Sequence, residues 1–66
     1  MKEVIGKVLD YDGYSGKIKY NDNLYLLLDN NVINNDISKD SMVSFIPEEV
    51  NGILIARFVK KIGKDK

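Results

Sequence analysis

The chain has 66 residues, with ten basic and ten acidic side chains and neither histidine nor cysteine. A chain of this length forms one small domain that buries a modest fraction of its surface, which argues against an elaborate enclosed active site. The missing residue types exclude a disulfide framework and the usual zinc sites, and they remove the commonest general base and the thiol nucleophile.

Charge is distributed unevenly along the chain. Through Val50, five lysines stand against nine acidic residues, a net charge of about −4, whereas residues 51–66 carry five basic residues against one acid, about +4. Dedicated nucleic-acid binders usually have a basic domain, so overall neutrality argues against tight binding to a phosphate backbone.

The first residues predict a cytoplasmic protein. Charged side chains interrupt any apolar run in Met1–Gly6, which is unlike a signal peptide. No apolar run approaches the roughly 20 residues that a bilayer span needs, so we expect no membrane contact.

Residues 3–11 form the first predicted strand, because they are rich in β-branched and aliphatic side chains. Gly6 inside this strand indicates a bend or bulge of the kind that small barrels need to close. Asp12-Gly13 is the turn signal that follows, within a loop longer than two residues.

The second strand, residues 16–20, has the clearest alternation in the chain. Lys17 and Lys19 point to one face, while Ile18 and Tyr20 point to the other, because successive side chains in a strand leave opposite faces. The two strands together predict a β-hairpin.

The apolar run Leu24–Leu28 follows a polar turn at residues 21–23 and is the third predicted strand. One and a half turns of helix is the alternative, since periodicity cannot decide so short a segment, but the flanking turn residues favour a strand. We place Leu24 and Leu26 in the core, which leaves Tyr25 facing outward.

Residues 29–36 form a long polar connection. One short helical turn is expected there, with Asp29 or Asn30 as its cap. Val32 and Ile33 are expected to hold the connection against the barrel.

The last two predicted strands are residues 42–46 and 53–59. Pro47 lacks an N–H group, so it ends the fourth strand or lies on an edge. Gly52 is expected to supply a positive φ in the turn. We expect one domain over residues 1–60 and a short charged tail over 61–66. The predicted inward residues are Val8, Ile18, Leu24, Leu26, Val43 and Phe45.

Five short strands with a longer connection between the third and fourth predict an all-β fold, a small five-stranded antiparallel barrel of the oligonucleotide-binding (OB) type. Gly6–Tyr11 resembles the opening strand of the cold-shock domain family, and Ser15–Tyr20 stands where its first ribonucleoprotein motif would fall. Leu24–Leu28 stands at the second motif. Residues 37–45 match the family's entry to strand four in their apolar positions, and Ala56–Val59 resembles its closing Ala-x-Asn-Val.

The departures from the family lie mainly on the binding face that the resemblance implies. The family's exposed tryptophan corresponds to Asp10, two exposed aromatics correspond to Lys17 and Lys19, and a histidine corresponds to Leu27. Tyr25 alone keeps an aromatic at a stacking position, with Tyr11 and Tyr14 nearby as substitutes. Stacking contributes about 1–3 kcal/mol per base in such domains, so its loss predicts weak binding.

Six residues are the candidate nucleic-acid contacts: Lys7, Tyr11, Lys17, Lys19, Tyr25 and Leu27. The lysines can reach phosphates, or they can be a solvated strand face balanced by acids such as Asp10. An exposed Tyr25 beside Leu27 would form an apolar patch for a base or a protein, whereas Tyr11 can also pack on the barrel rim. A basic cluster near the end of the chain can steer nucleic acid or simply aid solubility; its members are Arg57, Lys60, Lys61, Lys64 and Lys66.

The leading hypothesis is a weak, non-enzymatic module that binds single-stranded RNA or DNA. The alternative is a protein-interaction or homodimerisation module, in which Tyr25 and Leu27 contact a protein partner or a second copy. Asp10 favours the alternative, because a carboxylate within the face would repel phosphate. The carboxylates have no recognisable acid/base or metal-loop spacing, so we expect no enzyme activity, no metal and no cofactor.

Overall fold

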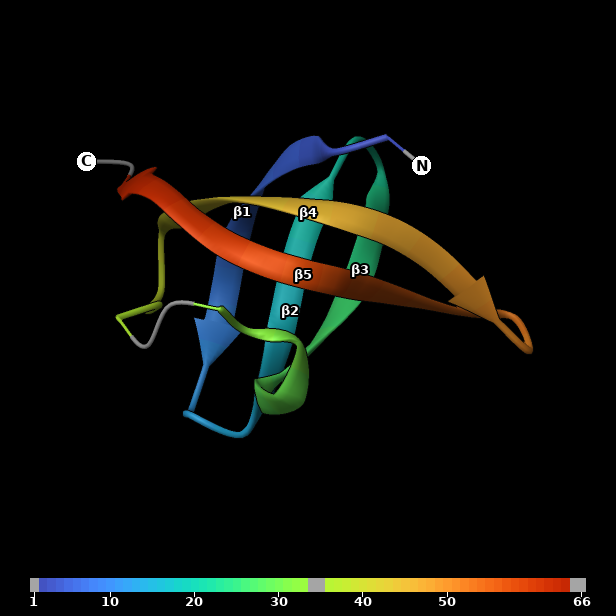
Figure 1. The fold of residues 1–66 in the computed structure, drawn as a ribbon, viewed down its shortest axis with the longest axis horizontal. Coiled ribbons are helices and arrows are strands. Elements are labelled where there is room, and N and C mark those ends of the chain that lie inside the picture. The colour runs from blue at the N-terminus through green and yellow to red at the C-terminus, as the bar shows by residue number, and fades with distance from the viewer. Residues whose placement is uncertain (1, 34–35, 65–66) are drawn as a thin grey trace.

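The computed structural model describes residues 2–33 and 36–64, and no α-helix occurs within those two ranges. It contains five strands and one short 3-10 helix, η1 (Figure 1). In chain order the elements are β1 Val4–Tyr11, β2 Ser15–Tyr20, β3 Asn23–Leu28, η1 Asp29–Asn31, β4 Ser41–Val50 and β5 Ile53–Lys64. The predicted third strand is therefore confirmed over its helical alternative.

The strands close into a barrel in the order β1-β2-β3-β5-β4, with β4 paired back onto β1. This confirms the all-β, five-stranded barrel and is compatible with an OB-like fold. The expectation of purely antiparallel pairing is wrong at one place, since β3 and β5 are parallel. Five is an odd number, so strand directions cannot alternate all the way around a closed ring, and one neighbouring pair has to be parallel.

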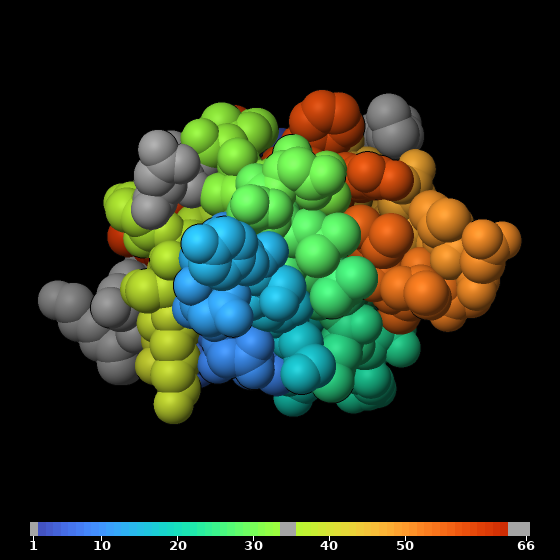
Figure 2. Space-filling view, turned by 90° about the horizontal axis from the view of Figure 1, so that it is seen from below, coloured from blue at the N-terminus to red at the C-terminus, as the bar shows by residue number. Residues whose placement is uncertain are grey.

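The β4–β5 hairpin is the longest part of the structure and extends past the barrel as an arm, residues 48–54 (Figure 1). Seen from below, the turn end of β1 and β2 (blue), the segment from β3 to η1 (green) and this arm (orange) form one continuous surface (Figure 2). The arm turns at Asn51 and Gly52, whose φ angles of 53° and 82° give the positive values that a two-residue hairpin turn requires. The prediction for Gly52 is confirmed.

The core lies inside the barrel and takes side chains from all five strands. Val8, Ile18, Val43 and Phe45 are fully buried, as predicted. The rings of Tyr20 and Tyr25 pack around Phe45, with centroids 6.0 and 5.2 Å from it. Aromatic pairs at these separations stabilise beyond the area that they bury. The remaining buried apolar residues are Leu27, Ile37, Ala56 and Val59.

The predicted inward residues of β3 are wrong by one position. Leu24 is 51% exposed and Leu26 is half-buried, whereas Tyr25 is 8% exposed and Leu27 is fully buried. The register explains the difference, because Ile18 of β2 lies opposite Tyr25. Directly opposite residues share a face of the sheet, so the inward Ile18 brings Tyr25 inward and turns its neighbours outward.

Both strands of the last hairpin are longer than predicted. Pro47 does not end β4, since it pairs with Ala56, but β4 contacts β1 only from Met42 to Phe45, so Pro47 lies on an edge there. On the other strand, Lys61 pairs with Val43 and β5 continues to residue 64. Residues 61–64 thus belong to the barrel and not to a tail, while 65–66 lie outside the described residues.

A bulge interrupts β5 at Phe58. Ile46 lies opposite Arg57 and Ser44 opposite Lys60, so β5 has one residue more than β4 between these pairs. Phe58 has a φ of 53° and is 57% exposed, an uncommon backbone conformation for a bulky side chain.

The connection from β3 to β4 is tied to the barrel at several points. η1 is the expected helical turn, but Leu28 stands at its N-cap with no side-chain cap, so a cap by Asp29 or Asn30 is wrong. Val32 packs on the core and bridges to Val59, as predicted. Ile33 is exposed, and its backbone N–H donates to the Val59 carbonyl.

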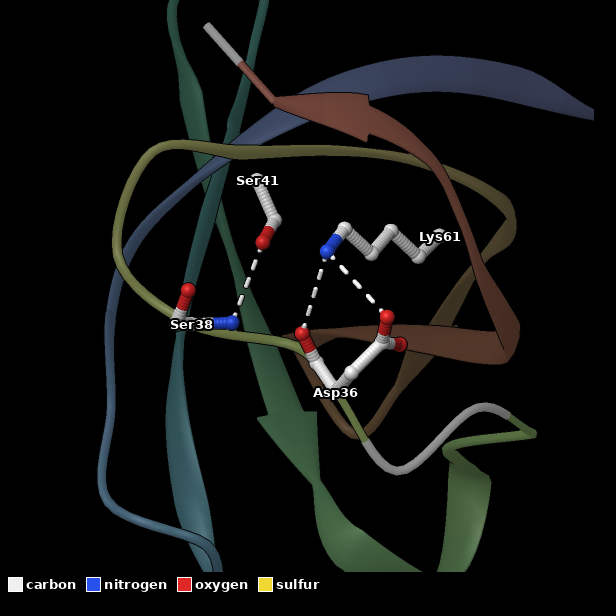
Figure 3. A network of polar contacts seen from close by, with 4 residues as sticks. All are labelled: Asp36, Ser38, Ser41 and Lys61. Atoms are coloured by element: carbon white, nitrogen blue, oxygen red, sulfur yellow. Dashed lines mark hydrogen bonds and ion pairs between the residues drawn. The ribbon is translucent and has the colours of Figure 1, made fainter.

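Polar contacts hold the second half of this connection (Figure 3). Lys61 Nζ lies 3.3 Å from the Asp36 carbonyl oxygen and 3.2 Å from Asp36 Oδ2. The backbone N–H of Ser38 donates to Ser41 Oγ over 3.0 Å, and Ser41 is fully buried. Lys61 therefore joins the end of β5 to the chain that enters β4.

Candidate functional site

The outer face of β1 and β2 brings together the three candidate lysines. Lys7 lies directly opposite Lys19 in the β1–β2 ladder, and Lys17 lies two residues further along β2. Lys17 and Lys19 are exposed, as the alternation of β2 predicts, and Lys7 on β1 is half-buried. Like charges directly opposite each other in a sheet repel, so a nearby negative charge on this face is stabilising.

Carboxylates reduce the positive charge of this face. Lys7 Nζ lies 3.6 Å from Asp40 Oδ1, with both side chains substantially exposed, and exposed pairs of this kind contribute about 0–1 kcal/mol. Asp10 lies opposite Lys17, directly after a bulge at Leu9 of β1. The face is therefore mixed in charge.

The β1–β2 loop is ordered by Asp12. Its Oδ1 accepts hydrogen bonds from the backbone N–H groups of Tyr14 and Ser15, each over 2.9 Å. These bonds, with that from Ser15 the strongest influence, hold the pKa of Asp12 below its ordinary value of 3.8. The loop presents Tyr14 at its tip, with 75% of the residue exposed.

A shallow depression of about 410 Å³ lies beside this loop, lined by Asp10, Tyr11, Asp12, Ser15, Gly16, Lys17 and Leu26. Tyr11 is half-buried and packs against the core. This matches the alternative expectation for Tyr11, that it packs on the rim of the barrel. Burial raises the pKa of the Tyr11 hydroxyl above 10.0, and the charges of Asp29 and Asp12 raise it further. The hydroxyl therefore stays protonated at neutral pH and can donate a hydrogen bond.

Tyr25 and Leu27 lie in the core and are not part of the exposed face, so their assignment as surface contacts is wrong. Leu24 and Leu26 take the outward positions, opposite Lys19 and Lys17. An unbroken apolar run contains no alternation of polar and apolar residues, so the run itself does not show its phase, that is, which alternate side chains face the core. The only signal in the sequence is Ile18, whose inward position determines the phase of β3 through the hairpin register.

Among the described side chains of β5, the basic residues Arg57, Lys60 and Lys61 do not form one patch. Arg57 pairs with Glu48 and lies 3.5 Å from Asn31 Oδ1, while Lys61 pairs with Asp36. Lys60 is exposed on β5, two strands away from both β1 and β2 in the barrel order. These contacts fit a structural role for Arg57 and Lys61.

Within residues 2–33 and 36–64, no group of three or more acidic side chains is placed to hold a metal ion. Over the same residues, no helix is long and apolar enough to cross a membrane. Comparisons of the chain with protein-family models, with curated proteins and with solved structures found no match.

Proposed function

We propose that the chain binds single-stranded nucleic acid weakly, along the outer face of β1 and β2. The main support for this proposal is that Lys7 and Lys19 lie directly opposite each other, with Lys17 on the same face. Adjacent ammonium groups on one face can contact neighbouring phosphates of a polyanionic ligand.

The resemblance to cold-shock domains supports the same face. The five-stranded barrel carries Gly16, Lys17 and Ile18 on β2, the strand that corresponds to the family's first nucleic-acid motif. The family's stacking aromatics are absent from these positions. Tyr14 offers an exposed ring at the loop tip, and the Tyr11 hydroxyl can donate to a phosphate or a base.

Binding that depends on lysines is sensitive to salt. Three phosphate contacts on a single strand give a log–log slope of about −2, so the affinity is expected to fall roughly 20-fold between 50 and 200 mM salt. Asp10 opposes binding, because its carboxylate lies opposite Lys17.

The test is a fluorescence titration with labelled 12-nucleotide RNA and DNA strands at both salt concentrations. The double variant Lys7→Ala with Lys19→Ala is expected to remove most of the binding. Its matched control, Lys39→Ala with Lys60→Ala, removes the same charge from the connection and from β5 and is expected to cost much less. Equal losses in the two double variants, or an affinity that salt does not change, would contradict the proposal.

Asp10→Asn gives a second test, in which the affinity for nucleic acid is expected to rise and not to fall. Removing the carboxylate is expected to strengthen binding a few-fold at 50 mM salt and less at 200 mM, because salt screens the repulsion. Asp10→Trp adds a stacking surface and is expected to strengthen binding further. No gain from either variant, in a chain whose melting temperature is unchanged, would count against nucleic acid on this face.

A further inference from the structure

An exposed apolar strip runs along β3 and β5, where these strands lie side by side. Its members are Leu24 and Leu26 on β3 and Ile53 and Ile55 on β5. Leu24 and Ile53 are 51% and 54% exposed, and the other two are half-buried. In the view from below, green β3 and the orange arm are neighbours on one face (Figure 2).

Charges of opposite sign flank the strip. Lys17 lies opposite Leu26, Leu26 lies opposite Ile55, and Ile55 lies opposite Glu48. One transverse row across β2, β3, β5 and β4 therefore runs basic, apolar, apolar, acidic. Neither end of the row is buried, since Lys17 is exposed and 43% of the Glu48 side chain is accessible.

This order is complementary to itself. When the row is reversed, it reads acidic, apolar, apolar, basic, so every lysine meets a glutamate and every apolar side chain meets another. Such self-complementarity is the requirement of an isologous two-fold interface. We propose that the strip is the contact surface for a second copy of this chain, with the two-fold axis passing between Leu26 and Ile55.

The local contacts of the two charged residues allow this pairing. Arg57 engages Oε1 of Glu48, and the second carboxylate oxygen can accept from Lys17 of the second copy. Lys17 lies opposite Asp10 of β1 and is exposed, so its ammonium group can also donate to a carboxylate of a second copy. The two flanking pairs set the register of the copies, while burial of the apolar strip supplies the attraction.

The size of the surface predicts a weak dimer. A specific interface at the low end buries about 1,200 Å² in total, or roughly 600 Å² from each copy. That is about one seventh of the 4422 Å² of accessible surface of the chain. An interface at this low end of the size range associates weakly, so dimerisation is expected at micromolar or higher concentrations.

Sedimentation equilibrium over a concentration series tests the proposal directly. The unmodified chain is expected to dimerise. Lys17→Glu and Glu48→Lys are each expected to weaken the dimer at least tenfold, because each places like charges at both ends of the row. Glu49→Lys is the matched control, since it makes the same charge change on the other face of β4 and is expected to leave the dimer unchanged.

Mixing the two charge-reversed variants gives the decisive result. In a mixed pair, the acid introduced by Lys17→Glu on one chain meets the base introduced by Glu48→Lys on the other. At the opposite end of the row, the unchanged Glu48 of the first chain meets the unchanged Lys17 of the second, so dimerisation is expected to return.

Two outcomes would overturn the proposal. One is an unmodified chain that stays monomeric at millimolar concentration. The other is a pair of variants that stay folded by circular dichroism but regain nothing when mixed. No nucleic acid is present in this experiment, so its outcome is independent of the proposed binding to RNA or DNA.

Discussion

β2 and β3 are neighbours of equal length, yet their sequences specify the two strands differently. β2 alternates lysine with apolar residues, and its own pattern determines which side faces the core. β3 is apolar at five consecutive positions, so leucine would be buried whichever set of alternate residues faced the core. Its pairing with β2 determines which set does so. The pairing of Ile18 with Tyr25 and the packing of Tyr25 on Phe45 decide it.

The most direct test of this difference is leucine truncation along β3. Leu27→Ala removes a fully buried side chain and is expected to cost about 2–5 kcal/mol of unfolding free energy. Leu26→Ala removes a half-buried side chain and should cost clearly less, and Leu24→Ala should cost about 0.5 kcal/mol or less. Urea denaturation measures all three. A larger cost for Leu26→Ala than for Leu27→Ala would reverse the phase assigned to β3.

The next largest loss of stability is expected at Gly16, the residue of β2 that lies opposite Leu27. A Cβ on Gly16 would stand 2.0 Å from the Asp10 carbonyl oxygen, which is backbone and cannot move without distorting β1. Gly16→Ala is therefore expected to cost about 1–3 kcal/mol, as overpacked sites do. Gly63→Ala is the control, because nothing lies within 4 Å of its added Cβ, and it should be neutral or slightly stabilising. Similar melting temperatures for the two variants would show that the close approach at Gly16 is not needed.

A third strand, β5, changes phase at its bulge. Phe58 holds a φ of 53° with its side chain largely in solvent, so little burial offsets the cost of the left-handed conformation. Phe58→Asn keeps a residue that tolerates this conformation and should stabilise the fold by about 1 kcal/mol. Thermal melting checks the gain, with Phe58→Ala as the control that removes the ring without favouring the left-handed region. A loss of stability in Phe58→Asn would mean that the ring makes a stabilising contact.

The smallest expected effect is the pH response of the loop before β2. The folded state lowers the pKa of Asp12, so its stabilising contribution is complete above the unfolded value near 3.8 and is lost as the pH falls through the lower folded value. Asp12→Asn keeps an acceptor for Tyr14 and Ser15 but does not titrate. Between pH 5 and 2 the melting temperature of the unmodified chain should fall slightly more than that of Asp12→Asn. Parallel curves would exclude Asp12 as a contributor.

Much of the fold was predictable because its signals are local. The strands, the Gly52 turn and the inward positions Val8, Ile18, Val43 and Phe45 follow from alternation and turn chemistry. The inward side of β3, the continuation of β4 through Pro47 and the bulge at Phe58 depend on how each strand pairs with its neighbour. No pattern within those strands indicates them.

The candidate site divides in the same way. Lys17 and Lys19 were predicted correctly as exposed, because their own strand alternates. The prediction that Tyr25 and Leu27 face outward is wrong because the apolar run of β3 contains no alternation that shows which side chains face the core. The same reversal moves Leu24 and Leu26 onto the surface, where they form half of the proposed dimer strip.

The order of strands around the barrel has a consequence for how the protein folds. β1, β2 and β3 are joined by short turns and can pair with one another early in folding, but both outer edges of that three-stranded sheet lack their native partners until β4 and β5 dock. The β4–β5 hairpin covers both edges, pairing Phe45 with Val4 on one side and Ile55 with Leu26 on the other. Such non-local closure is slow compared with hairpin formation, and an open apolar edge is prone to pair with other chains. A chain in which β4 and β5 have not yet docked is thus the species most exposed to aggregation, and the rate of barrel closure determines how long that species persists.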